Sequence, residues 1–397
     1  MTRIYADNAA TTKMSKTAIA AMLPYFDECY GNPSSLHTVG QLAAEALVGA
    51  RQQIADCLGA NAKEIYFTSG GSEADNQAIL TAAENGLRKG KKHIISQKTE
   101  HHAVLHCLRK MEKQGFEVTL LDVNGEGTVN PEDVRDAIRS DTCLVTIMTA
   151  NNEIGTIQPI KAIADICHEK GVLFHTDAVQ AVGHIPVNVQ EIGCDMLSLA
   201  GHKFHGPKGV GALYVKKGIF PSILIEGGAQ ERGRRAGTEN IPGICGMAAA
   251  LKEAVDKLDE NTAKLTKMRN RLIEGLGEIP HSIVNGSLTN RLPGNVNMCF
   301  EGIEGESLLL KLDAKGICAS SGSACTSGSL DPSHVLLAIG RPHEIAHGSL
   351  RLTLSEENTP EEMEYIITSV KDVVAYLRNM SPIWQDLQEG KRKYVIQ

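Results

Sequence analysis

Long apolar runs are missing from this 397-residue sequence. No hydrophobic stretch approaches the roughly 20 residues that a membrane-spanning helix needs. The first residues, MTRIYADNAATTK, lack the apolar segment of a secretory signal peptide. A strong excess of one charge is missing too, because the formal net charge is -7 and the pI is near 6.1. We therefore expect a cytoplasmic protein whose partners are neither nucleic acids nor membranes.

The ten cysteines form no C-x-x-C pair. They indicate reduced thiols rather than a disulfide framework, and most lie in apolar stretches where a thiol is buried and inert. Cys325 differs, because SSGSACTSGS (320–329) holds only Gly, Ala, Ser, Thr and this one Cys. Such a segment cannot anchor a core, so we expect a mobile, exposed loop that presents the thiol. A flexible loop with an incidental cysteine is the alternative.

Strand-like and helix-like segments alternate from about residue 40 to residue 215. Continuous apolar strands separated by helices predict an α/β fold, with a mainly parallel sheet covered by helices on both faces. One helix is expected to begin after Asn130, because Asn is a favourable cap and Pro131 suits the first helical position. The expected strands are 65–67, 93–96, 118–123, 143–149, 172–178, 196–201 and 211–215.

The pattern changes after a long helical stretch at about 244–276, which could bridge two domains. Thr359 and Glu362 have the spacing of a capping box and predict the start of a later helix. A smaller α+β domain is expected here, with strands at 295–300, 317–321 and 350–355.

Lys203 follows an apolar segment and precedes a glycine-rich turn, in SLAGHKFHGPKG. Ligand sites of α/β proteins usually lie at this edge of a parallel sheet. Partial burial there would lower the pKa of the lysine and make it a nucleophilic amine for carbonyl chemistry. A surface lysine in a loop is the alternative. Gly206 to Gly211 resembles part of a nucleotide-binding loop, but a strand rather than a helix is expected after it.

Asp177 ends another expected strand, in HTDAVQ, and Gln180 follows three residues later. A carboxylate at that edge suits a protonated pyridine nitrogen, although a lone Asp there is more often a helix cap or a turn former. Gly70 and Gly71 lie between a strand and Ser72, where a helix opens. This arrangement can present a helix start to a phosphate, or it can be a capped helix with no ligand.

His101 follows an expected strand and begins a helix, whose dipole favours the neutral imidazole. A neutral imidazole can stack on an aromatic ring and carry protons near pH 7. A metal site at Glu100, His101 and His102 is disfavoured, because adjacent residues do not share a helix face. Arg351 lies on an expected strand, where its guanidinium suits a substrate carboxylate. A structural salt bridge is the more common role.

Together these segments closely resemble the cysteine desulfurases of the NifS/IscS type, in the class V branch of the fold type I pyridoxal-phosphate enzymes. The resemblance covers nearly the whole chain in the family's order. It is carried by DNAATT (7–12), GNPSSLH (31–37), FTSGGSEADN (67–76), TEHHAVL (99–105), ANNEIGTIQ (150–158), HTDAVQ (175–180), GHKFHGPKGVGALY (201–214), RRAGTEN (234–240), SSGSACTS (320–327) and SPIW (381–384).

The resemblance implies a seven-stranded, mainly parallel sheet in a large cofactor-binding domain at 15–260. The small α+β domain would comprise 1–14 and 261–397 and would carry the catalytic cysteine loop at about 320–332. Lys203 would bind pyridoxal 5'-phosphate covalently as an aldimine and serve as the base.

The resemblance also implies roles for other residues. Asp177 would pair with the pyridinium nitrogen, and His101 would stack on the ring and move protons. Arg351 would hold the substrate carboxylate. The ring oxygen would be bound by Asn152 and Gln180, and the phosphate by Gly71, Ser72, His202 and, across the interface of a homodimer, Thr238.

The implied activity converts L-cysteine to L-alanine. The Cys325 thiolate, the only competent form of this nucleophile, would attack the substrate sulfur and become a persulfide. A sulfur-acceptor protein, such as an iron–sulfur scaffold, would take the sulfur for iron–sulfur cluster assembly or thiolation. A selenocysteine lyase or a class V aminotransferase is the alternative, since both share Lys203 and Asp177 without needing a mobile cysteine. A non-catalytic scaffold is disfavoured, because the lysine, acid, histidine and cysteine are all retained.

The sequence departs from the family at two places. Many members have a hydroxyl residue directly before Gly-His-Lys, where this chain has Ala200. One phosphate hydrogen bond worth about 1 kcal/mol is then missing, so we expect weaker cofactor retention but not lost activity. The last residues (388–397) do not resemble the tail with which family members hold a scaffold protein, which leaves the sulfur acceptor open.

Overall fold

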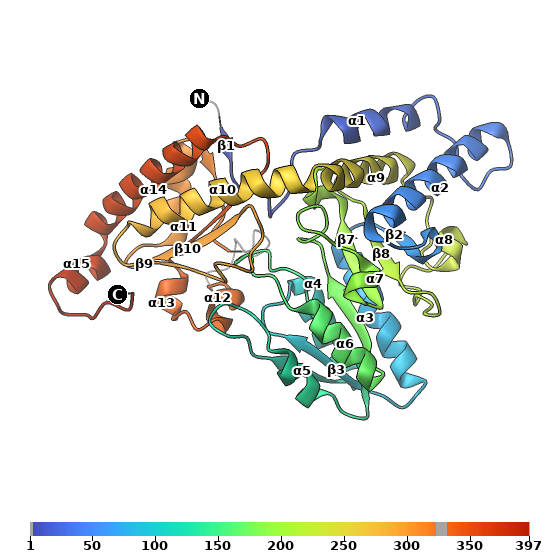
Figure 1. The fold of residues 1–397 in the computed structure, drawn as a ribbon, viewed down its shortest axis with the longest axis horizontal. Coiled ribbons are helices and arrows are strands. Elements are labelled where there is room, and N and C mark those ends of the chain that lie inside the picture. Colours follow the sequence, from blue (N-terminus) through green and yellow to red (C-terminus); the bar gives the residue numbers. More distant parts are fainter. Residues whose placement is uncertain (1–2, 323–331, 397) are drawn as a thin grey trace.

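A computed structural model describes residues 3–322 and 332–396 of the chain (Figure 1). Cys325 lies outside the described residues, so its predicted placement stays a prediction. Among the described residues, none of the helices is both long and apolar enough to span a membrane.

Seven strands form the large sheet, in the order β2-β8-β7-β6-β5-β3-β4. β8 is antiparallel to its neighbours β2 and β7, and the other neighbouring strands run parallel. The expected mainly parallel α/β sheet is therefore confirmed. The strands are β2 (Ile65–Thr68), β3 (His93–Gln97), β4 (Glu117–Leu121), β5 (Thr142–Thr146), β6 (Leu173–Asp177), β7 (Met196–Ala200) and β8 (Gly211–Val215).

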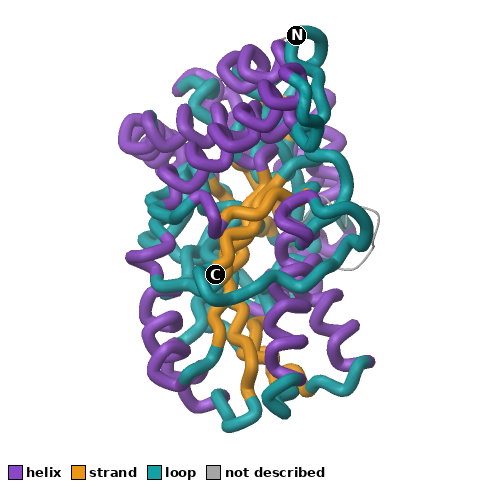
Figure 2. Tube along the Cα trace, turned by 90° about the vertical axis from the view of Figure 1, so that its right-hand side faces the viewer, coloured by secondary structure: helices purple, strands orange, loops and turns teal. Residues whose placement is uncertain are grey.

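Helices cover both faces of this sheet (Figure 2). Successive strand residues point to opposite faces, so Leu213 joins the apolar cluster under α3 and α4, whereas Tyr214 joins the cluster under α2, α6 and α9. Asn130 caps α5 as expected. These helices are α2 (Thr38–Leu58), α3 (Gly71–Leu87), α4 (His102–Lys113), α5 (Pro131–Ala137), α6 (Ile160–Lys170) and α9 (Ile241–Asp256), with α1 (Lys16–Met22), α7 (Val189–Ile192) and α8 (Gln230–Gly233) beside them.

The long helix expected at 244–276 is two helices, α9 and α10 (Leu258–Gly277), which meet at Lys257. The backbone of Lys257 leaves the helical region at φ -104° and ψ 10°. α9 packs against α1 and α2, whereas α10 packs against α14 and the smaller sheet. The break lets each helix follow the core it contacts, and the pair still joins the two halves of the molecule (Figure 1).

The smaller half is built on an antiparallel sheet of β9 (Ser282–Val284), β10 (Asn295–Phe300) and β12 (Ser349–Thr353). The N-terminal β1 (Ile4–Tyr5) reaches this half and pairs with β11 (Ile317–Cys318), which is shorter than the expected strand at 317–321. The predicted capping box of Thr359 and Glu362 starts α14. Besides α10, the described helices of this half are α11 (Gly305–Ala314), α12 (His334–Ala338), α13 (His343–Ala346), α14 (Pro360–Met380) and α15 (Pro382–Gln388).

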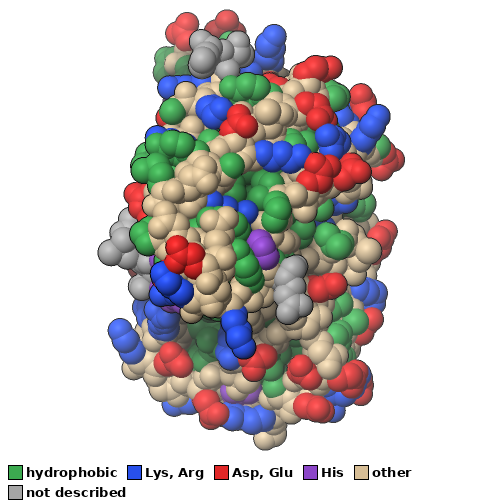
Figure 3. Space-filling model, turned by 90° about the vertical axis from the view of Figure 1, so that its left-hand side faces the viewer, with side chains coloured by type: hydrophobic (Ala, Val, Ile, Leu, Met, Phe, Trp, Pro, Cys, Tyr) green, Lys and Arg blue, Asp and Glu red, His purple; other side chains and the backbone are tan. Residues whose placement is uncertain are grey.

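Acidic and basic side chains alternate over the end of the molecule that the smaller half forms (Figure 3). A broad hollow of about 820 Å³ lies between α11, α13, α14 and α15. None of its lining residues belongs to the large sheet or to the predicted site.

Candidate active site

A cavity of about 200 Å³ lies where β2, β3, β5, β6 and β7 of the large sheet end. Of the predicted site residues that the structure describes, all except Thr238 line it. Among the described residues, the lining is Ala9, Ala10, Gly71, Ser72, Asp75, His101, Met148, Asn152, Asp177, Val179, Gln180, Ala200, His202, Lys203 and Arg351.

Lys203 lies in the short 3-10 turn η3 (Gly201–Lys203), which follows β7. It is partly buried at the cavity rather than in an exposed loop. Its Nζ atom donates to the carbonyl oxygens of Ala9 and Ala10, at 2.5 and 2.9 Å. Thr12 holds the same loop by donating through its hydroxyl to the carbonyl of His202, at 3.0 Å. The N-terminal DNAATT segment thus supplies the acceptors that aim the amine, a role that the motif alone did not predict.

Asp177 ends β6 and is buried in the wall of the cavity. Its Oδ1 accepts the N–H of Val179 at 2.9 Å, so it is a turn former as well as a pocket residue. Burial raises the pKa of Asp177 to about 6, although the Val179 hydrogen bond and the charge of Lys203 oppose the rise. A cationic group in the cavity would compensate the ionised form of this acid.

His101 caps α4, and its Nδ1 accepts the N–H of Ala103 at 3.1 Å. Burial, assisted by the positive charge of Lys203, lowers the pKa of His101 to about 4. The imidazole is therefore neutral at pH 7, as predicted, but burial is the main cause and not the helix dipole that we invoked.

The start of α3 is shaped for close approach of a ligand to the backbone. A Cβ atom added to Gly71 would lie only 2.6 Å from Cγ2 of Val179, so any larger residue would have to displace the Val179 side chain. The first N–H groups of a helix have no partner within the helix, and Gly71 and Ser72 place this end at the cavity. His202 lies at the same cavity, where burial lowers its pKa to about 4. These donors suit a phosphate.

Arg351 on β12 is only 1% exposed and reaches the cavity from the smaller half. Its Nη2 donates to Oδ1 of Asp7 at 2.8 Å, and its Nη1 donates to the carbonyl of Asn152 at 3.3 Å. Its buried Nε makes no hydrogen bond within the described part of the chain. Arg351 therefore makes the structural salt bridge considered above and also lines the site.

One predicted site residue that the structure describes is not part of this cavity. Thr238 is exposed and outside the lining, so its predicted contact with another subunit's cofactor stays a prediction. Within residues 3–322 and 332–396, no group of three His, Cys, Asp or Glu residues could hold a metal ion. The residues that we missed are Asp7 and Asp75, which only their positions within DNAATT and SEADN could have indicated.

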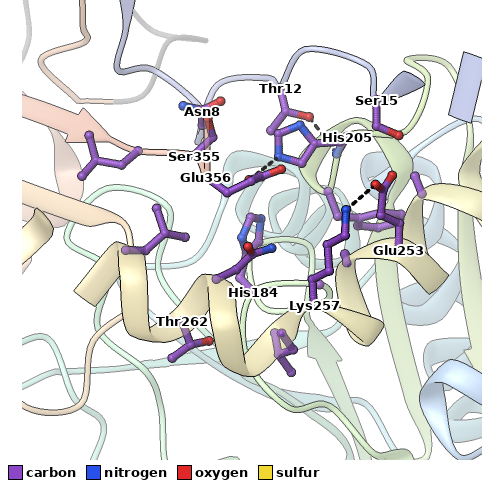
Figure 4. A pocket seen from close by; sticks show the side chains of 18 residues that line it. Asn8, Thr12, Ser15, His184, His205, Glu253, Lys257, Thr262, Ser355 and Glu356 are labelled. Atoms are coloured by element: carbon purple, nitrogen blue, oxygen red, sulfur yellow. Dashed lines mark hydrogen bonds and ion pairs between the residues drawn. The ribbon is translucent and has the colours of Figure 1, made fainter. Parts of the chain in front are cut away.

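A second, smaller hollow separates the Lys203 loop from the smaller half (Figure 4). His205 has a left-handed backbone at φ 65° and donates through Nδ1 to the carbonyl of Lys13. Its Nε2 lies 3.2 Å from Oε2 of Glu356, and Figure 4 shows this pair spanning the hollow. His184 donates to the carbonyl of Lys203 at 2.8 Å. The ion pair links the loop of Lys203 to the segment that follows β12 and Arg351.

The cavity combines an amine, a buried acid, a neutral imidazole and the start of a helix. This donor set fits pyridoxal phosphate, whose aldehyde, ring nitrogen, ring face and phosphate match these groups in turn. The sequence model of the aminotransferase class-V family matches residues 4–366 of this chain. The chain belongs to this family. It is therefore a pyridoxal-phosphate-dependent enzyme with the fold type I architecture.

Within the class V family, the chain is similar to proteins named cysteine desulfurase IscS. The protein from Methanosarcina thermophila is 56% identical over 380 residues, which cover 96% of this chain and 94% of the relative. A protein from Clostridium botulinum is 50% identical over 394 residues, with 98% and 99% covered. These identities place the chain among the cysteine desulfurases.

Solved structures agree with this placement. A NifS-like protein superposes with a TM-score of 0.89 at 38% identity, over 94% of this chain and all of the other. A structure described as SspA in complex with cysteine superposes with a TM-score of 0.79 at 37% identity, over 90% of this chain and all of the other.

Proposed function

We propose that this cysteine desulfurase converts L-cysteine to L-alanine and takes the sulfur as a persulfide on Cys325. The observation that carries the proposal is the meeting of Lys203, Asp177, His101 and Arg351 around one cavity. Conversion of an amino acid needs all four kinds of group together. A lysine in a surface loop or a purely structural salt bridge would not lie with the other groups around one cavity. The cysteine desulfurases named above support cysteine as the substrate.

Each side chain has a task that its surroundings support. Arg351 is held by Asp7 and offers its guanidinium to the substrate carboxylate. Lys203, aimed by the carbonyls of Ala9 and Ala10, is placed to take a proton from the substrate at Nζ. His101 is neutral at pH 7, so its imidazole can accept a proton and then pass it on. When bound, pyridoxal phosphate withdraws electrons from the substrate.

The cofactor contacts follow the same geometry. Asp177 would hold the ring nitrogen, Asn152 and Gln180 the ring oxygen, and Gly71, Ser72 and His202 the phosphate. Cys325 would attack the sulfur of cysteine as a thiolate. A new S–S bond forms, the C–S bond breaks, and its electron pair stays with the carbon skeleton that becomes alanine.

A homodimer, with Thr238 of each subunit reaching the other subunit's cofactor, completes the proposal. Large apolar side chains are exposed on α1, on the turn after it and on α2, among them Tyr30 at 71% and Leu36 at 92%. Exposed apolar groups of this kind mark interfaces. Thr238 follows α8, which Figure 1 places at the same end of the molecule as α2. A sulfur-acceptor protein, such as an iron–sulfur scaffold, would then bind the loaded enzyme.

We also propose the division at 15–260 and at 1–14 with 261–397. Separate hydrophobic clusters support it, because Ile4, Leu272, Phe300 and Val370 share one core that excludes the large sheet. A cytoplasmic location is supported by the nine described cysteines, which are all free thiols and suit a reducing compartment.

Product analysis tests the proposed reaction. With excess cysteine and a thiol reductant, the holoenzyme should release alanine and sulfide in equal amounts. Cys325→Ser should lose at least about 100-fold of both, because no nucleophile removes the sulfur. An enzyme that keeps its activity on cysteine without this thiol would contradict the proposal. A keto acid formed in place of alanine would also contradict it and would favour an aminotransferase.

A further inference from the structure

Asp75 is a buried acid of the cavity to which the proposed reaction assigns no task. It lies in the second turn of α3, is 1% exposed and contributes to the lining beside Asp177. Its Oδ1 makes no hydrogen bond in the described part of the chain. A buried carboxylate oxygen without a donor is costly when ionised. The position of Asp75 therefore needs an explanation.

The charges around Asp75 do not balance if it is ionised. Asp177 on β6 and Glu100 after β3 are both buried acids close enough to raise its pKa, after burial itself, which is the larger cause. Two cationic side chains line this cavity: Arg351, which pairs with Asp7, and Lys203, which lowers the pKa of Asp177. From α4, Cys107 faces Asp75 as a neutral thiol, whose pKa burial raises to about 11. Because Arg351 already pairs with Asp7, Lys203 alone cannot compensate three buried carboxylates.

A chain of neutral hydrogen-bonding groups surrounds Asp75 on the sheet side. Ser198 on β7 hydrogen-bonds to its carboxyl, and the same hydroxyl lies 2.9 Å from Nε2 of His175. The other ring nitrogen of His175 lies 2.8 Å from the hydroxyl of Thr146. Burial lowers the pKa of His175 to about 3, so this ring is neutral although it lies 3.7 Å from Asp75. The Ser198 hydrogen bond alone would lower the pKa of Asp75, but burial and the charges of Asp177 and Glu100 outweigh it and raise the pKa.

Asp75 and Asp177 differ in what stabilises their ionised forms. Asp177 accepts the N–H of Val179 at 2.9 Å and feels the charge of Lys203. Asp75 faces the hydroxyl of Ser198 and a neutral imidazole. Two neighbouring buried carboxyl groups share one proton, and these contacts assign the proton to Asp75.

We propose that Asp75 is a positioning residue, which stays protonated in the resting enzyme and so leaves Asp177 as the ionised carboxylate of the pair. The inference rests on the proposed role of Asp177 as the acid that pairs with the ring nitrogen. A proton on Asp177 instead would leave a neutral acid there, and a neutral acid cannot hold a pyridinium charge. Ser198 and His175 keep the protonated carboxyl in place.

Infrared spectroscopy of the holoenzyme locates the proton without using cysteine. With ¹³C-labelled aspartate carboxyl groups, the spectrum at pH 7 should contain a label-shifted C=O band of a protonated acid. The label excludes Glu100, and Asp195, which is also buried, faces Lys216. The band should vanish in Asp75→Asn and persist in Asp177→Asn. A spectrum without such a band, or a band that Asp75→Asn leaves in place, would overturn the proposal.

Cofactor binding gives a second readout. Asn is a neutral isostere of protonated Asp, so Asp75→Asn should change the dissociation constant of pyridoxal phosphate at pH 7 by less than about threefold and leave the visible absorption band unchanged. Asp177→Asn should weaken binding by at least about tenfold. Equal losses in both variants would contradict the inference. If Asp75→Asn does not fold, the spectrum of Asp177→Asn still tests the proposal, because the labelled C=O band should persist in that variant. If the labelled C=O band is present but the enzyme does not convert cysteine, the proposed function is wrong and the inference about Asp75 still holds.

Discussion

Ala200 stands where many members of the family have a hydroxyl residue that can hydrogen-bond to the cofactor phosphate. It lines the cavity with a methyl group, close to the start of α3. We expect Ala200→Ser to tighten pyridoxal phosphate binding by up to about fivefold, because one added hydrogen bond contributes about 1 kcal/mol. Equilibrium titration of the apoenzyme with pyridoxal phosphate measures the dissociation constant. Pyridoxal, which lacks the phosphate, is the control ligand, and an equal gain with pyridoxal would show that the hydroxyl acts elsewhere.

Glu100 makes the apoenzyme sensitive to pH. It is fully buried, accepts the N–H of Met148 at 2.7 Å, and has a pKa raised by burial from 4.5 to about 8. The unfolded chain ionises this acid near 4.5, whereas the folded chain does so only near 8. Its contribution to stability is thus present below about pH 4.5 and is lost as the pH rises to 8.

The variant Glu100→Gln tests this linkage. The free energy of unfolding of the apoenzyme should fall less steeply between pH 5 and 8 than in the wild type, because the glutamine cannot ionise. Urea denaturation at several pH values measures it. Glu260, exposed near the start of α10, provides the control variant Glu260→Gln, which should keep the wild-type slope. Parallel pH profiles for wild type and Glu100→Gln would contradict the account.

Single residues of the site were predictable to different degrees. Lys203, Asp177 and His101 follow strands whose apolar runs are continuous, so their place at the sheet edge could be predicted. Asp75 could not, because a polar residue in a helix is usually exposed, and its burial follows from the packing of α3 on β7. The salt bridge of Arg351 with Asp7 joins positions 344 residues apart, which no local pattern reveals.

Among the elements, the strands were predicted well and their arrangement was not. Continuous apolar runs mark β2 to β8, but nothing in GALYV indicates that β8 is antiparallel and lies between β2 and β7. The break between α9 and α10 was missed, because Lys257 is neither Gly nor Pro and the helical pattern continues across it. The break follows from packing on two separate cores.

The link between the Lys203 loop and the segment after β12 depends on pH. Burial alone would raise the pKa of Glu356, but the hydrogen bond and charge of His205 outweigh it and lower the pKa to about 2. Burial likewise would lower the pKa of His205, but Glu356 raises it. The stabilisation through His205 is present below its unfolded pKa of 6.5 and is lost as the pH rises through the folded value. The stabilisation through Glu356 is present above pH 4.5 and is lost as the pH falls from 4.5 toward 2.

Glu356→Gln should therefore lower the free energy of unfolding by about 1 kcal/mol at pH 6, a value that allows for the partial exposure of Glu356. The difference from wild type should shrink as the pH rises and His205 becomes neutral. Urea denaturation at pH 6 and pH 9 measures both. The neighbouring Glu357 pairs with Lys13 at the exposed surface, so Glu357→Gln is the control and should change stability by less than about 0.5 kcal/mol. A loss at pH 9 as large as at pH 6 would contradict a role for the ion pair.

At the scale of the whole molecule, the proposed site is complete only in a dimer. Tyr30→Asp places a charge in the exposed apolar surface near α2 and should produce monomers that bind pyridoxal phosphate about fivefold or more weakly, because Thr238 of a partner is lost. Sedimentation velocity and cofactor titration measure the two effects. Leu310→Asp, at a site that is 68% exposed on α11, is the control and should remain dimeric. Wild-type monomers with full cofactor affinity would contradict the proposed assembly.

The central claim is that sulfur from cysteine becomes attached to Cys325. Peptide mass spectrometry after one addition of cysteine to the holoenzyme, with free thiols blocked on quenching, tests it most directly. The account predicts a gain of one sulfur atom on the peptide that contains Cys325, and no gain in Lys203→Ala. An unmodified Cys325 in an enzyme that consumes cysteine, or sulfur found on another of the ten cysteines, would contradict it.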